Sequence, residues 1–324
     1  MLLQVGSTPD APFRLRELCW VPSPAARERT ERDGVATGTP TKLLKATPSP
    51  QPSPAMRERE EPASTMHPLV HVQVANNSFV IEHTLVGTTN PAAPLIVFLH
   101  EGLGSVAMWR DFPAKLCEAI GARGLVYSRP GYGKSTPRPH DEKWSVDFMY
   151  VHAREVLPAL LEAIAPNVKP WLFGHSDGGS IALIHAALFT HNAAGVIVAA
   201  PHIFVEEISV TSIAQTRETY LQTDLRSKLA RYHNDVDSAF WGWNDIWLNP
   251  AFRAWNIEAL LPQITCPLLA IQGVNDEYGT MAQIDSIAQA VSHAQPVKLE
   301  NCGHSPHRDQ PQAVIDAVKK FVTL

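Results

Sequence analysis

Short apolar runs that alternate with helical stretches are the feature that most restricts the fold of this chain. From residue 95 onward the runs lack the polar alternation of a half-exposed strand, which is typical of strands buried on both faces. Longer stretches with helical character, such as 147–165 and 178–191, lie between them. This alternation predicts an α/β fold with a mostly parallel, doubly wound sheet and helices on both faces. The apolar runs are 95–100, 124–129, 171–175, 195–200, 268–273 and 296–300.

The folded domain is expected to cover residues 66–324. Residues 71–74 and 79–86 alternate apolar and polar side chains, as in two half-buried strands joined by a turn. Before them, residues 1–65 are rich in proline, and "PSPAARERTE" at 22–31 returns as "PSPAMREREE" at 52–61. Such a segment cannot bury enough apolar surface to offset the entropy of ordering it. We therefore expect 1–65 to be a disordered extension, with Met66 as an alternative natural start.

One connection is much longer than the others. About 60 residues, roughly 203–262, separate the sixth strand from the next, where a single helix would suffice. The segment contains a helical stretch at 214–233, followed by a cluster of aromatic residues. Ligands of doubly wound sheets bind beyond the carboxyl ends of the strands. An insertion that starts at such an end is well placed to cover a site, so we predict a helical lid after the sixth strand.

Charge and hydropathy exclude several classes of partner. The formal net charge of −5 gives no basic face for DNA or RNA. No apolar stretch approaches the roughly 18 residues that cross a membrane, and the amino terminus lacks the apolar core of a signal peptide. Cys19, Cys117, Cys266 and Cys302 are widely scattered, which favours free thiols in a reducing compartment. We expect a cytoplasmic protein that binds neither nucleic acid nor membrane, and a homodimer is left open.

Ser176 is the candidate nucleophile. It stands in "GHSDG", directly after the predicted strand 171–175 and before the predicted helix 178–191. A sharp strand–turn–helix of this kind exposes the serine hydroxyl, and the glycines at 174 and 178 allow the close packing that the turn needs. The pattern alone is common, but its position between a strand and a helix makes it specific.

A serine hydroxyl needs a base, and the base needs an orienting acid. In this architecture the acid and then the histidine follow the serine along the chain. Asp276 comes just after the strand 268–273, and His304 comes just after the last strand. Glu277 is the alternative acid. His307 is the alternative base, although we expect it in the first turn of the final helix, where it would point away.

The developing negative charge on a substrate oxygen needs preorganised donors. We expect the backbone N–H groups of Asp177 and Gly102 to supply them. Gly102 lies in the loop "EGLGS" after the strand 95–100.

The motifs "FLHEGLGS", "SRPGYGKS", "GHSDGGS", "GVNDEYG" and "GHSPHRDQP" resemble the α/β-hydrolase superfamily in their order and spacing. The similarity covers essentially residues 69–324 and is greatest to the lidded serine enzymes that hydrolyse ring-cleavage products, enol-lactones and small esters. It implies catalysis by Ser176, His304 and Asp276. One departure is Glu101, because the family usually has glycine after the histidine of the first motif. Its carboxylate could bind a basic group of the substrate or pair with a nearby cation such as Arg129.

No cofactor is expected. The "GYGKS" segment at 131–135 resembles the end of a phosphate-binding loop, but Ser128 stands where that loop requires glycine. The sequence "TPRPHDEK" that follows would break the helix the loop also requires. No histidine or cysteine spacing indicates a metal site.

Flat apolar side chains near the site suggest the substrate. The predicted lid carries a cluster of aromatic residues that includes Trp241 and Trp243, and Trp109 follows the oxyanion loop. Walls of this kind suit a small ring or short acyl chain. We therefore expect Trp109, Trp241, Trp243 and Glu101 to contact a small, largely apolar ester, lactone or ring-cleavage product. The alternative is a noncatalytic protein that binds a small ligand on the same scaffold.

Overall fold

A computed structural model describes residues 67–75 and 77–322 of the chain. Within them, an eight-stranded sheet has the order β1-β2-β4-β3-β5-β6-β7-β8. The β1–β2 and β2–β4 pairs are antiparallel and every other pair is parallel, as the sequence predicts. The strands are β1 (Leu69–Val74), β2 (Asn77–Gly87), β3 (Leu95–Leu99), β4 (Arg123–Tyr127), β5 (Trp171–His175), β6 (Gly195–Ala199), β7 (Leu268–Gly273) and β8 (Gln295–Leu299).

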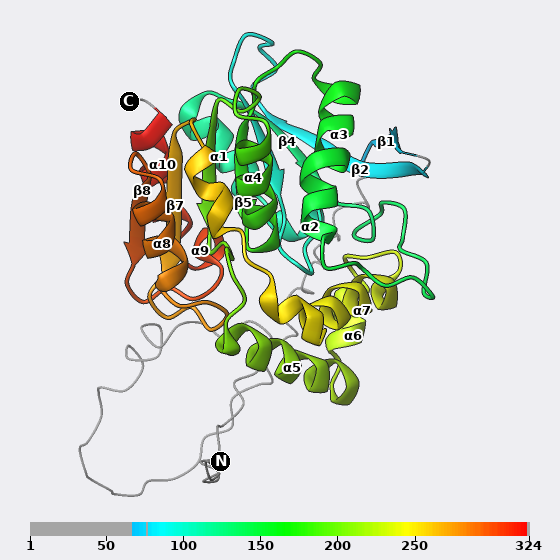
Figure 1. The fold of residues 1–324 in the computed structure, drawn as a ribbon. Helices are drawn as coiled ribbons and strands as arrows, with labels where there is room; N and C mark the ends of the chain where they lie inside the picture. The colour runs from blue at the N-terminus through cyan, green and yellow to red at the C-terminus, as the bar shows by residue number, and fades with distance from the viewer. Residues whose placement is uncertain (1–66, 76, 323–324) are drawn as a thin grey trace, which may run out of the picture. The chain divides into compact units, whose positions relative to one another are not determined.

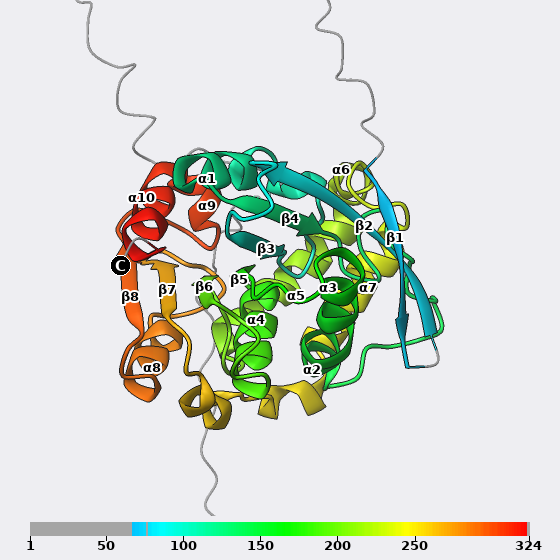
Figure 2. The same cartoon turned by 90° about the horizontal axis from the view of Figure 1, so that it is seen from above.

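Helices cover both faces of the sheet, and alternate side chains of the strands β3 to β7 enter the two cores. Val97 of β3 packs in the core with α3 (Leu157–Ile164), α4 (Asp177–Leu188) and α8 (Ala282–Ala290). Phe98, the next residue, enters the opposite core. There it packs with α1 (Phe112–Ile120) and α10 (Pro311–Val322). Figure 2 shows these two groups of helices on opposite sides of the sheet.

The strand register brings the candidate site residues to one edge of the sheet. Leu99 at the end of β3 pairs with Gly174 of β5, and His175 pairs with Ala199 at the end of β6. Gly273, which ends β7, pairs with Leu299, which ends β8. Parallel strands end at the same edge, so the loops that follow β3, β5, β7 and β8 emerge side by side.

The predicted helix 147–165 contains a change of helical type. α2 (Phe148–Val151) continues into a π-helical segment, His152–Val156, and then into α3. Pro158 has no N–H to donate to the carbonyl of Arg154 four residues back, so a regular α-helical ladder cannot run through this point. His185 of α4 contacts the carbonyl of Ala153 at 2.8 Å, which gives this wider turn an outside partner.

The insertion between β6 and β7 is helical, as predicted. It contains α5 (Glu207–Gln222), α6 (Leu225–Leu229) and α7 (Val236–Trp247), which lie together below the sheet in the view of Figure 1. Two 3₁₀ helices, Pro250–Ala254 and Glu258–Gln263, lead back to β7. The predicted helix 214–233 is divided, because Thr223 has an extended backbone and its hydroxyl accepts from the N–H of Leu225.

The two ends of the insertion meet at a short stem. Phe204 and Asn256 form an isolated antiparallel bridge. Beside it, the N–H of Ile257 donates to the carbonyl of Ile203 at 2.7 Å. The insertion therefore leaves and rejoins the main fold at nearly the same point.

Several expectations concern termini, membranes and thiols. The expected disordered extension, residues 1–65, and the alternative start at Met66 lie outside the described residues. Over 67–75 and 77–322, no helix combines the length and the apolar character that a membrane span needs. Cys117, Cys266 and Cys302 are free cysteines, whereas Cys19 falls in the part that is not described.

Candidate active site

Ser176 occupies a strained turn between β5 and α4. Its backbone has φ +51° and ψ −120°, a region that residues with a side chain rarely adopt. The two flanking glycines make the turn sterically feasible. A Cβ on Gly174 would come 2.3 Å from the carbonyl oxygen of Gly178, and one on Gly178 would come 2.1 Å from that of Leu99. This is the strand–turn–helix geometry that the sequence predicts around the serine.

The predicted triad residues come together in a hydrogen-bonded chain. Ser176 Oγ lies 2.9 Å from His304 Nε2, and His304 Nδ1 lies 2.8 Å from Asp276 Oδ1. Asp276 Oδ1 also accepts hydrogen bonds from the backbone N–H groups of Tyr278 and Gly279. These donors hold the carboxylate in one orientation, and the carboxylate in turn orients the imidazole.

Electrostatics favour an ionised Asp276 and a basic His304. Burial alone would raise the pKa of Asp276, but His304 and the N–H of Tyr278 hold it below its ordinary value. Burial alone would lower the pKa of His304, but the Asp276 carboxylate raises it above the ordinary value, with smaller contributions from Glu277 and Glu101. The imidazole is therefore well suited to accept a proton from the serine.

Neither alternative residue takes part in this chain. Glu277 Oε2 accepts from the backbone N–H of His304 at 3.2 Å and does not contact the imidazole. His307 lies in the separate short helix α9 (Pro306–Asp309), not in the final helix as expected. It is buried against the rings of Trp109 and His175, each with a centroid 4.7 Å from its own. Burial also holds the pKa of His307 well below the ordinary value.

The peptide between Glu101 and Gly102 has a fixed orientation. The carbonyl of Glu101 accepts from His100 Nδ1, Arg129 Nη2 and the N–H of Gly104, at 2.7, 2.9 and 3.1 Å. In a trans peptide the C=O and N–H point in opposite directions, so the Gly102 N–H points away from these donors. Within the described part of the chain, no backbone hydrogen bond uses the N–H of Gly102 or of Asp177. Both predicted oxyanion donors are therefore available to a ligand.

Helix α7 of the insertion contacts both predicted oxyanion donors. A Cβ on Gly102 would lie 2.2 Å from the ring of Trp243, so this tryptophan packs directly on the oxyanion loop. Trp247 Nε1 donates to Asp177 Oδ1 at 3.2 Å. Trp247 belongs to the aromatic cluster of the predicted lid, whereas the buried His202, whose ring it contacts, was not expected near the site.

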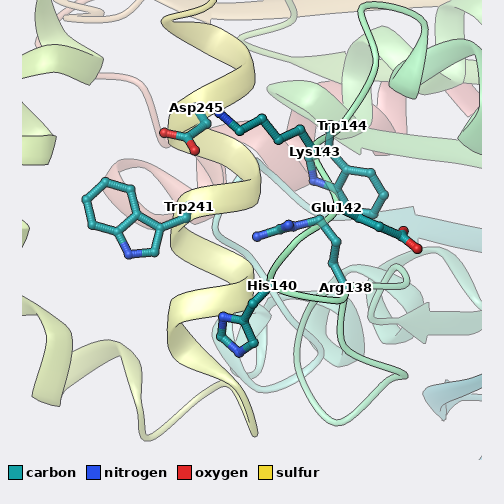
Figure 3. A pocket seen from close by; sticks show the side chains of 7 residues that line it. All are labelled: Arg138, His140, Glu142, Lys143, Trp144, Trp241 and Asp245. Atoms are coloured by element: carbon teal, nitrogen blue, oxygen red, sulfur yellow. The ribbon is translucent and has the colours of Figure 1, made fainter.

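Trp241 and Trp109 were expected to contact the substrate, but the structure places both outside the candidate site. Trp241 stands over the guanidinium of Arg217 and lines a separate cavity of about 160 Å³, shown in Figure 3. Trp109 is buried in the core beside Phe98 and Phe112, on the α1 and α10 side of the sheet. The residues that line the separate cavity are Arg138, His140, Glu142, Lys143, Trp144, Trp241 and Asp245, and none of them belongs to the triad or to the oxyanion loop.

Glu101 pairs with a different cation from the one expected. Its Oε1 accepts from Arg308 Nη2 at 2.9 Å, and its Oε2 lies 3.4 Å from His175 Nδ1. Arg129 instead binds the main-chain carbonyl of Glu101. The sequence did not indicate the roles of His175 and Arg308, because their common partner Glu101 is far from both of them along the chain.

A buried arginine lies behind the nucleophile turn. Arg129 is fully buried, and its Nη2 lies 3.8 Å from Asp177 Oδ2. Burial raises the pKa of Asp177 to about 6, although Arg129 and the hydrogen bond from Trp247 act in the opposite direction. The first residue of α4 thus has a carboxyl group whose pKa is about 6.

The glycine-rich segment 131–135 forms a turn, and no helix begins at Lys134. The backbone N–H of Lys134 and the hydroxyl of Ser128 both donate to Glu82 Oε2, at 2.8 and 2.7 Å. Among the residues that the structure describes, no group of three or more histidine, cysteine, aspartate or glutamate side chains is placed to hold a metal ion.

A mostly parallel sheet with a serine on its strand–helix turn, and with an acid and a histidine after later strands, defines the α/β-hydrolase class. The model of the alpha/beta hydrolase family matches residues 96–317, and the chain belongs to this family. This membership confirms the predicted fold and the expectation of a hydrolase.

Sequence and structure comparisons give more distant likenesses. The chain is 25% identical over 263 residues to 2-succinyl-6-hydroxy-2,4-cyclohexadiene-1-carboxylate synthase of Salmonella typhimurium, covering 72% of this chain and 96% of that protein. It resembles the enol-lactonase from Burkholderia xenovorans LB400 with a TM-score of 0.61 and 20% identity, over 79% of this chain and all of that one. A thermophilic esterase from Thermogutta terrifontis gives a TM-score of 0.60 at 18% identity, over 79% and 98% of the two chains.

Proposed function

We propose that this hydrolase cleaves a small, largely apolar ester, lactone or ring-cleavage product through a Ser-His-Asp triad. The observation that carries the proposal is the continuous chain from Ser176 Oγ through His304 to Asp276, with separations of 2.9 and 2.8 Å. A serine whose hydroxyl faces the base, and whose base faces a buried carboxylate, has the arrangement of an activated nucleophile.

For an ester or lactone, the reaction proceeds through an acyl-enzyme. Ser176 Oγ attacks the carbonyl carbon while His304 Nε2 takes the hydroxyl proton. The carbonyl oxygen becomes an oxyanion, which the N–H groups of Gly102 and Asp177 stabilise. When the tetrahedral intermediate collapses, the bond to the leaving oxygen breaks and His304 gives that oxygen its proton. Water then attacks the acyl-enzyme by the same steps and releases the acid.

The substrate class rests on the surroundings of the oxyanion donors. Trp243 packs on Gly102 and Trp247 bonds to Asp177, so helix α7 closes over the reacting position as a lid. Flat apolar rings favour a small ring or short acyl chain over a polar polymer. The similar proteins include, by their names, an enol-lactonase and an esterase, which supports ester or lactone hydrolysis.

The test combines a covalent label with a substrate panel. A fluorophosphonate should modify wild-type protein at Ser176, and Ser176→Ala should fold normally, escape the label and lose nearly all hydrolysis. Short-chain and aromatic acyl esters, lactones and ring-cleavage acids should show a higher kcat/KM than esters of twelve or more carbons. An unlabelled wild-type protein would point to the noncatalytic binding alternative, and a preference for long chains would refute the proposed small substrate.

A further inference from the structure

Four residues form a continuous polar chain from the oxyanion loop to the candidate base. Arg308 Nη2 donates to Glu101 Oε1 at 2.9 Å, and Glu101 Oε2 lies 3.4 Å from His175 Nδ1. The other ring nitrogen, His175 Nε2, lies 2.7 Å from the main-chain carbonyl oxygen of His304. Neither Glu101 nor His175 is needed for the triad itself, yet together they connect the loop after β3 to the loop after β8.

The hydrogen bond between His175 and the main-chain carbonyl of His304 can run in only one direction. A carbonyl oxygen and a carboxylate oxygen only accept hydrogen bonds, so His175 donates from Nε2 to the carbonyl of His304 and, when it bonds to Glu101, from Nδ1 as well. The backbone N–H of His304 donates to Glu277 on its other side. The main chain of the base is thus held at both its C=O and its N–H, and His175 provides one of the two contacts.

Glu101 takes part at its main chain as well as at its side chain. Its carbonyl is fixed by three donors, and this sets the direction of the Gly102 N–H, as described above. Its carboxylate lies against Gly104 of the same loop. A Cβ added to Gly104 would come 2.5 Å from Glu101 Oε2. A side chain at 104 would force the Glu101 carboxylate or the nearby His100 to shift, so glycine at this position suits the observed arrangement.

The carboxylate is charged and already has partners. Burial would raise the pKa of Glu101, but Arg308 and His175 hold it well below its ordinary value. The Glu101 side chain is 16% exposed and that of His175 is 1% exposed. A carboxylate with these two partners is better placed to position them than to bind an amine of the substrate.

We propose that Glu101 is a positioning residue that aligns the oxyanion loop with the general base, through His175 and the carbonyl of His304. The proposal rests on the proposed hydrolase function. The peptide of any residue at 101 could set the direction of the Gly102 N–H, but only a side chain with an acceptor, such as this carboxylate, can bond to His175 and Arg308.

The test compares Glu101→Gln and Glu101→Ala on a neutral ester. Glu101→Gln keeps the size of the side chain, and Glu162→Gln on the exposed face of α3 is the matched control for loss of one carboxylate. We expect kcat to fall about tenfold in Glu101→Gln and about a hundredfold in Glu101→Ala, with KM unchanged, because small displacements of reacting groups have effects of this size. The rate of fluorophosphonate labelling of Ser176 should fall in parallel.

Two readouts separate positioning from simple structural support. His175→Gln, which keeps a donor, should retain more kcat than His175→Leu, and combining His175→Leu with Glu101→Ala should cost less than the sum of the two. The low-pH limb of kcat/KM should also move to lower pH in Glu101→Gln, because Glu101 contributes to the raised pKa of His304.

The outcomes that overturn the proposal are distinct. Unchanged kcat and labelling in both Glu101 variants would refute it while Ser176 labelling of the wild type still supports the hydrolase. A rise in KM confined to amine-bearing esters would make Glu101 a substrate-binding residue. A lower melting temperature with unchanged kcat would make it a stabilising residue only. A wild-type protein that resists the label would refute the proposed function itself.

Discussion

Trp247 of the insertion donates a hydrogen bond from Nε1 to Oδ1 of Asp177, the residue that follows the candidate nucleophile. Both side chains are buried, and the bond joins two segments 70 residues apart. The same aspartate supplies one predicted oxyanion N–H. The position of α7 and the start of α4 are therefore directly linked.

Replacing Trp247 by phenylalanine should destabilise the protein more at pH 8 than at pH 5. The pKa of Asp177, about 6, is raised above its unfolded value, so the folded state favours the protonated form, and this contribution to stability is lost as pH rises through that pKa. At pH 8 the variant loses a bond to a charged group, worth about 1.5–3 kcal/mol, and at pH 5 a bond to a neutral one, worth about 0.5–1.5 kcal/mol. Urea unfolding at both pH values measures the difference.

The matched control for that substitution is Trp241→Phe, since Trp241 contacts Arg217 and not Asp177. Its effect should be independent of pH over this range. An equal loss at pH 5 and pH 8 for Trp247→Phe would show that the hydrogen bond does not favour the ionised form of Asp177.

Asp276→Asn should impair hydrolysis severely, whereas Glu277→Gln should have a mild effect. Asp276 faces the imidazole Nδ1, and an amide there would favour the wrong tautomer, a change that costs about 10⁴ in kcat in a related arrangement. The Glu277 carboxylate accepts a hydrogen bond from the backbone N–H of His304, not from its imidazole. Steady-state kinetics on the best ester would decide, and the reverse ranking would assign the acid to Glu277.

The kcat/KM of the wild type should rise with pH through a midpoint above the ordinary histidine pKa. His304 acts as a base only when neutral, and the Asp276 carboxylate raises its pKa despite burial. Glu277→Gln should lower the midpoint, because this carboxylate also stabilises the protonated imidazole. A profile with its midpoint below the ordinary value would contradict the environment described for His304.

Gly102→Ala should reduce kcat, and a smaller residue at position 243 should restore part of it. The added Cβ would lie 2.2 Å from the Trp243 ring, while the backbone of Gly102 is not in the left-handed region that excludes alanine. The loss therefore comes from the ring. Kinetics of Gly102→Ala, Trp243→Leu and the double variant form a cycle, and strictly additive losses would show that the two side chains do not compete for this space.

The sheet and the triad arrangement could be read from the sequence because their signals are local. Apolar runs mark the buried strands β3 to β7, and strand ends place Ser176, Asp276 and His304 at one edge wherever the helices lie. The run 296–300 was wrongly expected to be buried on both faces, because β8 lies at the edge of the sheet and its side chains are exposed or half-buried. The break in the predicted helix 214–233 depended on one capping hydroxyl, that of Thr223, which composition does not show.

The orientation of the tryptophans was harder to predict. Trp243 and Trp247 are four residues apart and share a face of α7, whereas Trp241 is two residues before Trp243 and projects from another side. A cluster of aromatics in a sequence does not show which face of the helix meets the site until the helix is docked. The partner of the Glu101 carboxylate could not be predicted either, because Arg308 is 207 residues away along the chain.

The short stem at Phe204 and Asn256 brings the two ends of the insertion together. Because its two ends are already adjacent at this bridge, the strand order and the triad place few demands on the length or composition of what lies between them. A helical segment from a relative could be grafted between these two residues while the nucleophile, acid and base keep their positions. Such a graft would have to keep the contacts of Trp243 with Gly102 and of Trp247 with Asp177, because these join the insertion to the two predicted oxyanion donors.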